Sequence, residues 1–150
     1  MDDPCLRDKI NGEWVELDSS AGQTHGVLNF QNITGSTCEM DSFPRVWFQN
    51  HTTADAMGQR ATYDLSTSTV SFDLLPGSWA WAAVTIINAG FVDGCSVVTS
   101  SSFLVVPTYP VSNAPWQTVA GKVQTPGISA CVNPDIGLIT VSTARWGHYA

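Results

Sequence analysis

Residues 76–91 read PGSWAWAAVTIINAGF, and this stretch decides the fold class. After the Pro-Gly turn signal, the side chains would alternate between the two sides of a β-strand. The two sides consist of Trp79, Trp81, Ala83 and Thr85, and of Ala80, Ala82, Val84 and Ile86. Because both sides are largely apolar, we expect that the strand is covered outside by another subunit or lines a large interior.

The rest of the chain also favours β-strands over helices. It has few Glu, Lys and Arg residues and no long apolar stripe at helical spacing, whereas Ser, Thr and Val are abundant. Turn signals such as Pro76-Gly77 and Pro126-Gly127 divide the segments. We expect strands at 12–18, 24–31, 34–40, 45–50, 59–65, 68–75, 79–88, 89–93, 97–106, 116–124 and 136–143. The pattern predicts an all-β fold and suits either a meander barrel or a sandwich.

The composition narrows the classes of partner. The 150 residues suffice for one domain with its own core. The formal net charge is −7 with only 6 Lys and Arg residues, which argues against nucleic acid and anionic membranes. No run approaches the roughly 18 apolar residues that a membrane-spanning helix needs. We therefore expect neither a nucleic-acid nor a membrane partner.

The cysteines indicate the compartment. The chain has four widely spaced cysteines and no C-x-x-C motif, namely Cys5, Cys38, Cys95 and Cys131. This pattern argues against a zinc ribbon and favours two disulfides, for which three connectivities exist. The sequons Asn32-Ile-Thr and Asn50-His-Thr predict glycosylation at both asparagines. Together these signals predict a secreted, extracellular protein.

Motifs for catalysis and for metal binding are not found in the sequence. The three histidines, His25, His51 and His148, lie in unrelated segments, and no H-x-x-x-H pair occurs. No Gly-x-Ser-x-Gly elbow and no Asp-x-Asp-x-Asp run occurs either. We therefore expect that the protein is not an enzyme and holds no metal.

Three stretches in this order resemble the avidin–streptavidin family: INGEWVELDSS at 10–20, NITGSTCE at 32–39, and FLVVP with NAPWQTVAGKVQT between 103 and 125. The resemblance implies an eight-stranded antiparallel up-and-down β-barrel. Residues 1–125 would form this barrel domain. Residues 126–150 would be a C-terminal extension that packs on the barrel or on a neighbouring subunit. The resemblance also implies a homo-dimer or homo-tetramer and the disulfides Cys5–Cys95 and Cys38–Cys131.

The same resemblance implies a ligand pocket with a changed polar lining. Ser20 matches the family's hydroxyl donor to the ureido oxygen of biotin. Glu16, Thr37 and Val123 replace three of the family's polar partners, so directional contacts to biotin would be lost. The expected ligand-binding residues are Trp14, Glu16, Ser20, Thr37, Phe72, Trp79, Trp81, Thr85, Phe103 and Trp116. In the family, the residue that Trp116 matches closes a neighbouring subunit's pocket; alternatively, Trp116 plugs the end of its own barrel.

These features predict a non-enzymatic, secreted protein that binds a mainly apolar small molecule. The ligand would be a pigment such as a carotenoid, or a lipid, held in the barrel or between barrels. One alternative is a biotin-binding protein of reduced affinity. A second alternative is a structural or defence protein with an empty pocket.

Overall fold

The computed structural model describes residues 3–5, 9–20, 22–40, 43–64, 71–106 and 121–149. In these ranges the regular structure is β-strand, apart from one short 3-10 helix, η1 (Ala89–Phe91). The strands are β1 (Asp3–Pro4), β2 (Ile10–Ser20), β3 (Gln23–Asn32), β4 (Cys38–Met40), β5 (Arg45–Gln49), β6 (Ala56–Met57), β7 (Thr62–Tyr63), β8 (Phe72–Leu74), β9 (Trp79–Ile87), β10 (Val97–Val106), β11 (Gly121–Cys131), β12 (Ile139–Val141) and β13 (Arg145–Trp146). The prediction of an all-β fold is confirmed.

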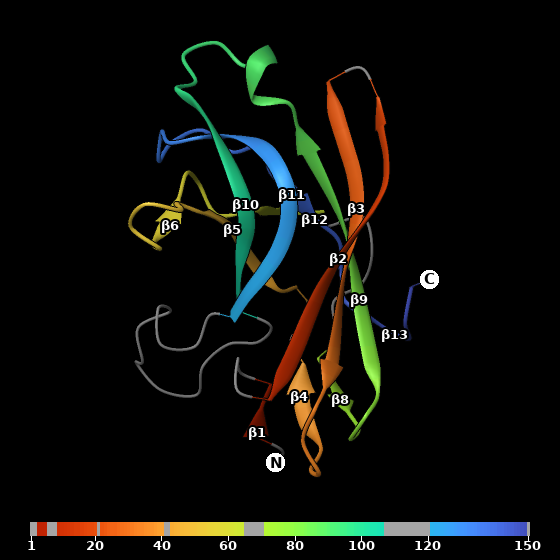
Figure 1. The fold of residues 1–150 in the computed structure, drawn as a ribbon. Helices are drawn as coiled ribbons and strands as arrows, with labels where there is room; N and C mark the ends of the chain where they lie inside the picture. Colours follow the sequence, from red (N-terminus) through yellow and green to blue (C-terminus); the bar gives the residue numbers. More distant parts are fainter. Residues whose placement is uncertain are drawn as a thin grey trace.

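The described strands form three sheets (Figure 1). The largest has the order β2-β3-β9-β12-β7, and β13 pairs with the part of β9 that β12 leaves free. The second has the order β11-β10-β5-β6, and a small third sheet has the order β1-β4-β8. Most pairs are antiparallel, whereas β1–β4 and β12–β7 are parallel.

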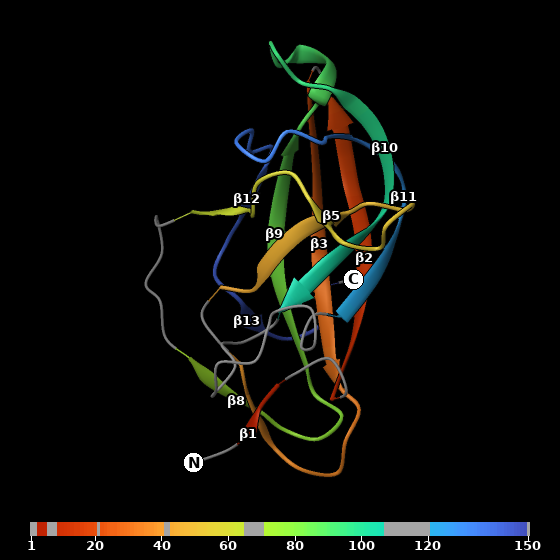
Figure 2. The same ribbon diagram turned by 90° about the vertical axis from the view of Figure 1, so that its left-hand side faces the viewer.

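The core lies between the two larger sheets. Figure 2 shows β5 and β10 in front of β3 and β9, as in a sandwich of two layers. Trp14 of β2 packs edge-on against Phe103 of β10, with ring centroids 5.2 Å apart, and Phe103 also contacts Phe48 of β5. Apolar side chains from both sheets therefore fill the space between them.

The eight-stranded barrel is not confirmed, because no sheet closes on itself. Closure requires that every strand has two hydrogen-bonded neighbours. Within the described residues, β2 pairs only with β3, and β11 pairs only with β10. The alternation of apolar and polar side chains along a strand is compatible with a sandwich as well as with a barrel, since both folds bury alternate side chains.

Residues 126–149 belong to the same two sheets as the rest of the chain. Strand β11 crosses the expected boundary at residue 125, and β12 lies inside the largest sheet between β9 and β7. The structure therefore does not separate a C-terminal extension from the domain. Pro126 and Gly127, which the sequence analysis takes as a boundary signal, lie in an irregularity of β11.

The disulfides are Cys5–Cys38 and Cys95–Cys131, so the two predicted pairs are wrong. The register explains the observed pairs. Cys5 follows β1, whose parallel pairing with β4 places Pro4 opposite Glu39 and brings the Cα atoms of Cys5 and Cys38 to 5.0 Å. The antiparallel pairing of β10 with β11 likewise brings Cys131 close to Cys95. Two disulfides are typical of a protein from an oxidising compartment.

The segment that follows β9 differs from the prediction. Residues 89–93, predicted as a strand, form η1 instead, because the side chain of Asn88 accepts a hydrogen bond from the Gly90 N–H and caps the turn.

No helix in the described part of the chain is long and apolar enough to cross a membrane.

Candidate functional site: an aromatic groove beside the C-terminal segment

The outer side of β9 is covered by the C-terminal segment, defined here as residues 145–149. Strand β13 pairs with β9 and places Arg145 opposite Trp81. The His148 ring lies 4.3 Å from the Trp79 ring, and the Tyr149 ring lies 5.1 Å from the Trp81 ring. The apolar outer side of β9 is thus covered by the chain itself. The observation behind the predicted homo-oligomer has another explanation, and the oligomeric state stays a prediction.

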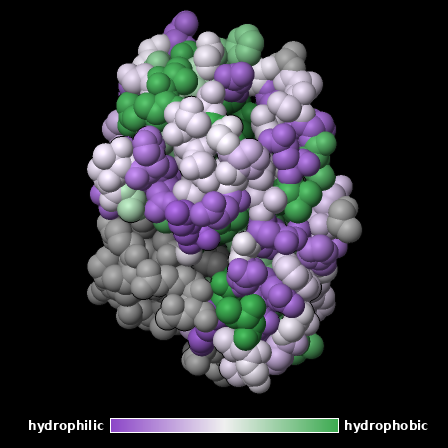
Figure 3. Space-filling view, in the orientation of Figure 1, coloured by the Kyte–Doolittle hydropathy of each residue, from purple (hydrophilic) through white to green (hydrophobic). Residues whose placement is uncertain are grey.

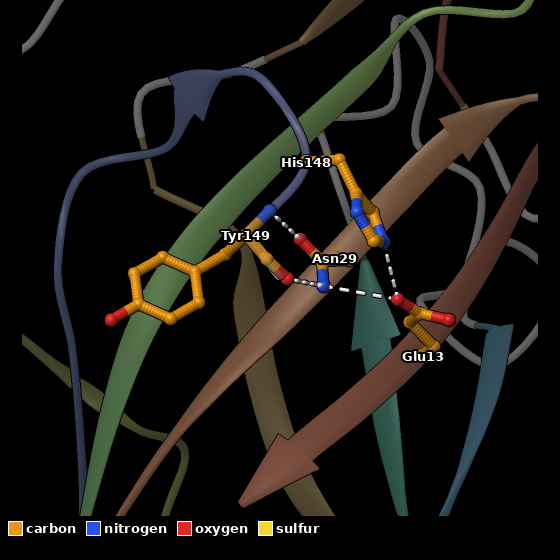
Figure 4. Close-up of polar contacts among 4 residues, drawn as sticks. All are labelled: Glu13, Asn29, His148 and Tyr149. Carbon is orange, nitrogen blue, oxygen red and sulfur yellow. Dashed lines mark hydrogen bonds and ion pairs between the residues drawn. The ribbon is translucent and has the colours of Figure 1, made fainter. Parts of the chain in front are cut away.

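A polar cluster holds this segment against the sheet (Figure 4). The buried Asn29 of β3 donates hydrogen bonds from Nδ2 to the Glu13 carboxylate and to the Tyr149 carbonyl oxygen, each at 3.1 Å. The Tyr149 N–H donates to Asn29 Oδ1 at 3.0 Å. Glu13 Oε1 also lies 2.7 Å from His148 Nε2. The buried side-chain amide of Asn29 therefore forms hydrogen bonds with both the N–H and the carbonyl oxygen of Tyr149, as the backbone of a neighbouring strand would.

Beside the C-terminal segment lies a hollow of about 320 Å³, which we call the aromatic groove. It is lined by Asp73, Leu75, Ser78, Trp79, Trp146, Gly147 and His148. Trp146 is largely exposed, yet its Nε1–H donates to the Asp73 carbonyl oxygen at 3.1 Å, and its ring packs edge-on against Phe72. Both tryptophans are therefore held in place by contacts within the chain.

Gly147 lines the groove in a conformation that favours glycine. Gly147 has φ 114°, a conformation that side-chain-bearing residues rarely adopt, and a Cβ built there would meet nothing within 4 Å. The walls are two indole rings and the exposed Leu75, whereas Ser78, Asp73 and His148 add polar atoms. Such a site can take the apolar face of a small molecule and bind its polar edge by hydrogen bonds.

The structure distributes the predicted ligand residues over several places. Trp79 lines the aromatic groove, Phe72 supports it, and Trp81 lies beneath the C-terminal segment. Phe103 is part of the core, and the partly buried Trp14 packs against it. A single pocket of the predicted composition is therefore not formed by the described residues.

The other predicted site residues lie elsewhere. Thr85 bonds to His25 on the outer side of β9, with Oγ1 and Nδ1 3.2 Å apart. Thr37 directly precedes Cys38. Glu16 and Ser20 line a second groove between the two larger sheets. Trp116, with its predicted role as a lid, lies outside the described residues.

The two sequons differ in access. Asn32 is fully buried, and its Nδ2 donates to the carbonyl oxygens of Ser36 and Leu74, each at 2.9 Å. A glycan on that nitrogen is incompatible with this packing, so the prediction for Asn32 is wrong. Asn50 is only partly buried, and its Oδ1 accepts from the Thr52 N–H. Glycosylation at Asn50 stays a prediction.

Leu75, Trp146 and His148 were not predicted from the sequence as parts of a site. A signal was present, because Arg145-Trp-Gly-His-Tyr149 concentrates three rings around a glycine near the end of the sequence. The position of Trp146 and His148 beside Trp79 depends on the pairing of β13 with β9, which sequence spacing alone does not reveal. Among the described residues, no group of three or more His, Cys, Asp or Glu side chains could hold a metal ion.

Comparison with known proteins gives one family. The model of the family described as "Domain of unknown function (DUF4232)" matches residues 5–144. Neither the curated proteins nor the solved structures contain a match to the chain. The family match neither supports nor excludes the resemblance to the avidin–streptavidin family, which stays a prediction. Because the match spans both larger sheets and both disulfides, the chain belongs to the DUF4232 family.

Proposed function

We propose that this chain is a non-enzymatic, secreted domain that binds a mainly apolar small molecule in the aromatic groove. The observation that carries the proposal is the pair of tryptophans, Trp79 and Trp146, which both line an open hollow and are held by their own contacts. Rings that are already held lose little conformational freedom when a ligand arrives. Exposed aromatic side chains in a hollow are also a frequent feature of ligand sites.

The interior of the sandwich is a poorer site for the same ligand. Phe103, Phe48 and Phe30 are buried in the space between the sheets. The hollow beside Phe30 and Val123 measures only about 30 Å³, far less than the aromatic groove. A carotenoid or lipid would have to displace core side chains there, at a cost of several kcal/mol, on the order of that for a large core substitution.

The groove supports moderate affinity. A ligand that covers about 150 Å² of apolar surface would gain about 4 kcal/mol from burial, before the cost of association is subtracted. Ring stacking adds on the order of 1 kcal/mol for each aromatic contact. We therefore expect dissociation constants in the micromolar range or weaker for small ring-shaped ligands.

The experiment is a fluorescence titration of the full chain with the apolar dye 8-anilinonaphthalene-1-sulfonate. We expect one saturable site, and we expect Leu75→Ser to weaken it about five- to tenfold through lost apolar contact. Val97→Ser is the matched control, because Val97 is 52% exposed and Leu75 is 58% exposed. Val97 begins β10, whose start lies at the end of the molecule opposite to β8, after which Leu75 follows (Figure 1).

Trp146→Ala should have a larger effect than Leu75→Ser, whereas Phe91→Ala, which removes a similarly exposed ring from η1, should have none. Equal loss in the groove variants and in their controls would contradict the proposal. The same titration with biotin should show no nanomolar binding. If neither the dye nor biotin binds at a single site, the alternative of a structural protein gains support.

A further inference from the structure

A second groove, which we call the polar groove, lies where the β2–β3 hairpin turns and β9 ends. It measures about 510 Å³. Strand β2 contributes Glu16, Ser19 and Ser20 to its wall, and β11 contributes Ile128 and Ser129. The two strands that flank it are the end strands of the two larger sheets.

Irregularities in both end strands open this groove. Further along, β2 and β11 are in close contact, since a Cβ at Gly12 would lie 2.7 Å from the Val123 side chain. Toward the groove, the pairing of β2 skips Leu17, and residues 125–127 of β11 face only Ser101. Bulges bend a strand and increase its twist. In Figure 1 the two strands accordingly curve away from each other in the upper part of the molecule.

The same bulges argue against a polypeptide strand as the occupant. Strand addition needs a regular row of backbone donors and acceptors along a sheet edge. Pro126 has no N–H, and the bulge around it interrupts the row on β11. Natural edge strands use such irregularities to prevent pairing. A small molecule that contacts side chains is therefore favoured.

The side chains of the groove define the chemistry of that molecule. Ser19, Ser20, Thr24 and Ser129 supply hydroxyl groups, each able to donate and to accept. The hydroxyls of Ser19 and Thr24 are 3.3 Å apart, so they form a paired polar site. Apolar surface in the groove is small, because Ile86 and Ile128 of its lining are 1% and 9% exposed. Over the junction of β11 and β2, the surface in Figure 3 is accordingly mainly white to purple, with few green atoms.

The described lining of the polar groove carries negative charge only. Glu16 is the carboxylate in its lining, and no Lys, Arg or His is among the described residues that line it. An exposed carboxylate without a neighbouring cation favours a positively charged partner. The hydroxyls favour a partner with many hydroxyl groups, because they can satisfy both its donors and its acceptors.

We propose that the polar groove binds a small polyhydroxylated cation of the amino-sugar class, with its ammonium group at Glu16 and its ring hydroxyls at the Ser and Thr side chains. This site shares no lining residue with the aromatic groove. Either site can therefore fail its test without affecting the other.

The test is an NMR titration of the full chain at constant ionic strength with glucosamine, N-acetylglucosamine and ethanolamine. Glucosamine should shift the amide signals of Gly22, Gly127 and Ser129. It should bind about two- to fivefold more tightly than N-acetylglucosamine, which lacks the charge, in keeping with an exposed ion pair. It should also bind more tightly than ethanolamine, which carries the charge without the ring of hydroxyls.

Two variants and one control complete the test. Glu16→Gln should remove the preference for glucosamine over N-acetylglucosamine, whereas Asp55→Asn, which removes an exposed carboxylate before β6, should keep it. Ser129→Trp should fill the groove and abolish binding of both sugars while leaving dye binding in the aromatic groove unchanged. Equal affinity for glucosamine and ethanolamine, a preference that persists in Glu16→Gln, or no shift at the three amides with any compound would overturn the proposal.

Discussion

The two sides of β9 are both apolar in sequence, yet they are covered in different ways. Ala80, Ala82, Val84 and Ile86 are buried against the opposite sheet. Trp79 and Trp81 on the other side are only half-buried, and the C-terminal segment contacts them through rings and through the polar cluster of Asn29 and Glu13. The inner side belongs to one continuous apolar core, whereas the outer side is closed by a few individual contacts.

Because of this difference, we expect the inner side of β9 to determine stability and the outer side to be available for binding. Removing a methyl group from a close-packed interior lowers the free energy of unfolding, because the cavity left behind does not fully collapse. A side covered by one short segment depends instead on a few hydrogen bonds and ring contacts, each of which contributes little alone. The aromatic groove lies beside that weaker cover, where solvent reaches Trp146. The next four changes test how far the two sides differ.

The largest effect is expected from Ile86→Ala on the inner side of β9. Ile86 is 1% exposed, so the change should lower the free energy of unfolding by about 2–5 kcal/mol. Its neighbour Ile87 is 39% exposed and points to the other side, so Ile87→Ala should cost less than about 1 kcal/mol. Urea denaturation of both variants measures the difference. Similar losses would contradict the contrast between the two sides.

The next effect is expected from Asn29→Ala, which removes the centre of the polar cluster. The change leaves the Tyr149 N–H and carbonyl oxygen without their side-chain partners and should cost about 1–3 kcal/mol. Hydrogen exchange at the Tyr149 amide should become much faster, while exchange at the Ala82 amide should follow global stability alone. Gln31→Ala on the same strand is the control, because Gln31 bonds to Gly77 and not to the C-terminal segment. Unchanged protection of Tyr149 would show that the rings alone hold the segment.

The strands that could be predicted from the sequence are the long ones with clear alternation. Residues 24–31, 79–88 and 97–106 fall on β3, β9 and β10, within one or two residues at the ends. Short strands were placed less well. Within the described parts of 34–40 and 59–65, only Cys38–Met40 and Thr62–Tyr63 are strands, because the chain bends at 34–36 and at 58–59 before each of them. Alternation over three residues carries too little information to fix a strand.

The candidate sites were predictable only in part, because they depend on which strands become neighbours. The resemblance implied Trp79 as a ligand residue of a barrel pocket, whereas in the structure Trp79 lines the aromatic groove. Trp146 was missed, since its place beside Trp79 follows from the pairing of β13 with β9. The disulfides failed for the same reason: the parallel pairing of β1 with β4 decides the partner of Cys5. Such non-local pairings are set by the whole fold and not by local pattern.

A smaller effect is expected from Arg145→Ala on the outer side. The guanidinium carbon of Arg145 lies 5.3 Å from the centroid of the Trp81 ring. A cation over an exposed indole contributes about 0.5–1 kcal/mol, so the free energy of unfolding should fall by that amount. Arg60→Ala is the matched control, since it removes a similar contact with Tyr63 away from β9. Only Arg145→Ala should change the fluorescence of Trp81; a change in both would show that the signal reports general loosening.

The smallest effect is expected from the ion pair between Glu13 and His148, although the two atoms are only 2.7 Å apart. The side chains of the two residues are 42% and 41% exposed, so water and salt screen their attraction. The pair is ionic only while the imidazole is protonated, and otherwise it is a hydrogen bond. A double-mutant cycle with Glu13→Gln and His148→Ala should give a coupling of about 0.2–1 kcal/mol that falls as salt is added.

Glu13 also accepts a hydrogen bond from Asn29, so Glu13→Gln alone should cost more than the coupling, because the buried amide loses a charged acceptor. A coupling of several kcal/mol that is insensitive to salt would mean that the outer side of β9 is as well shielded as the inner side, and the contrast between the two sides would then be lost.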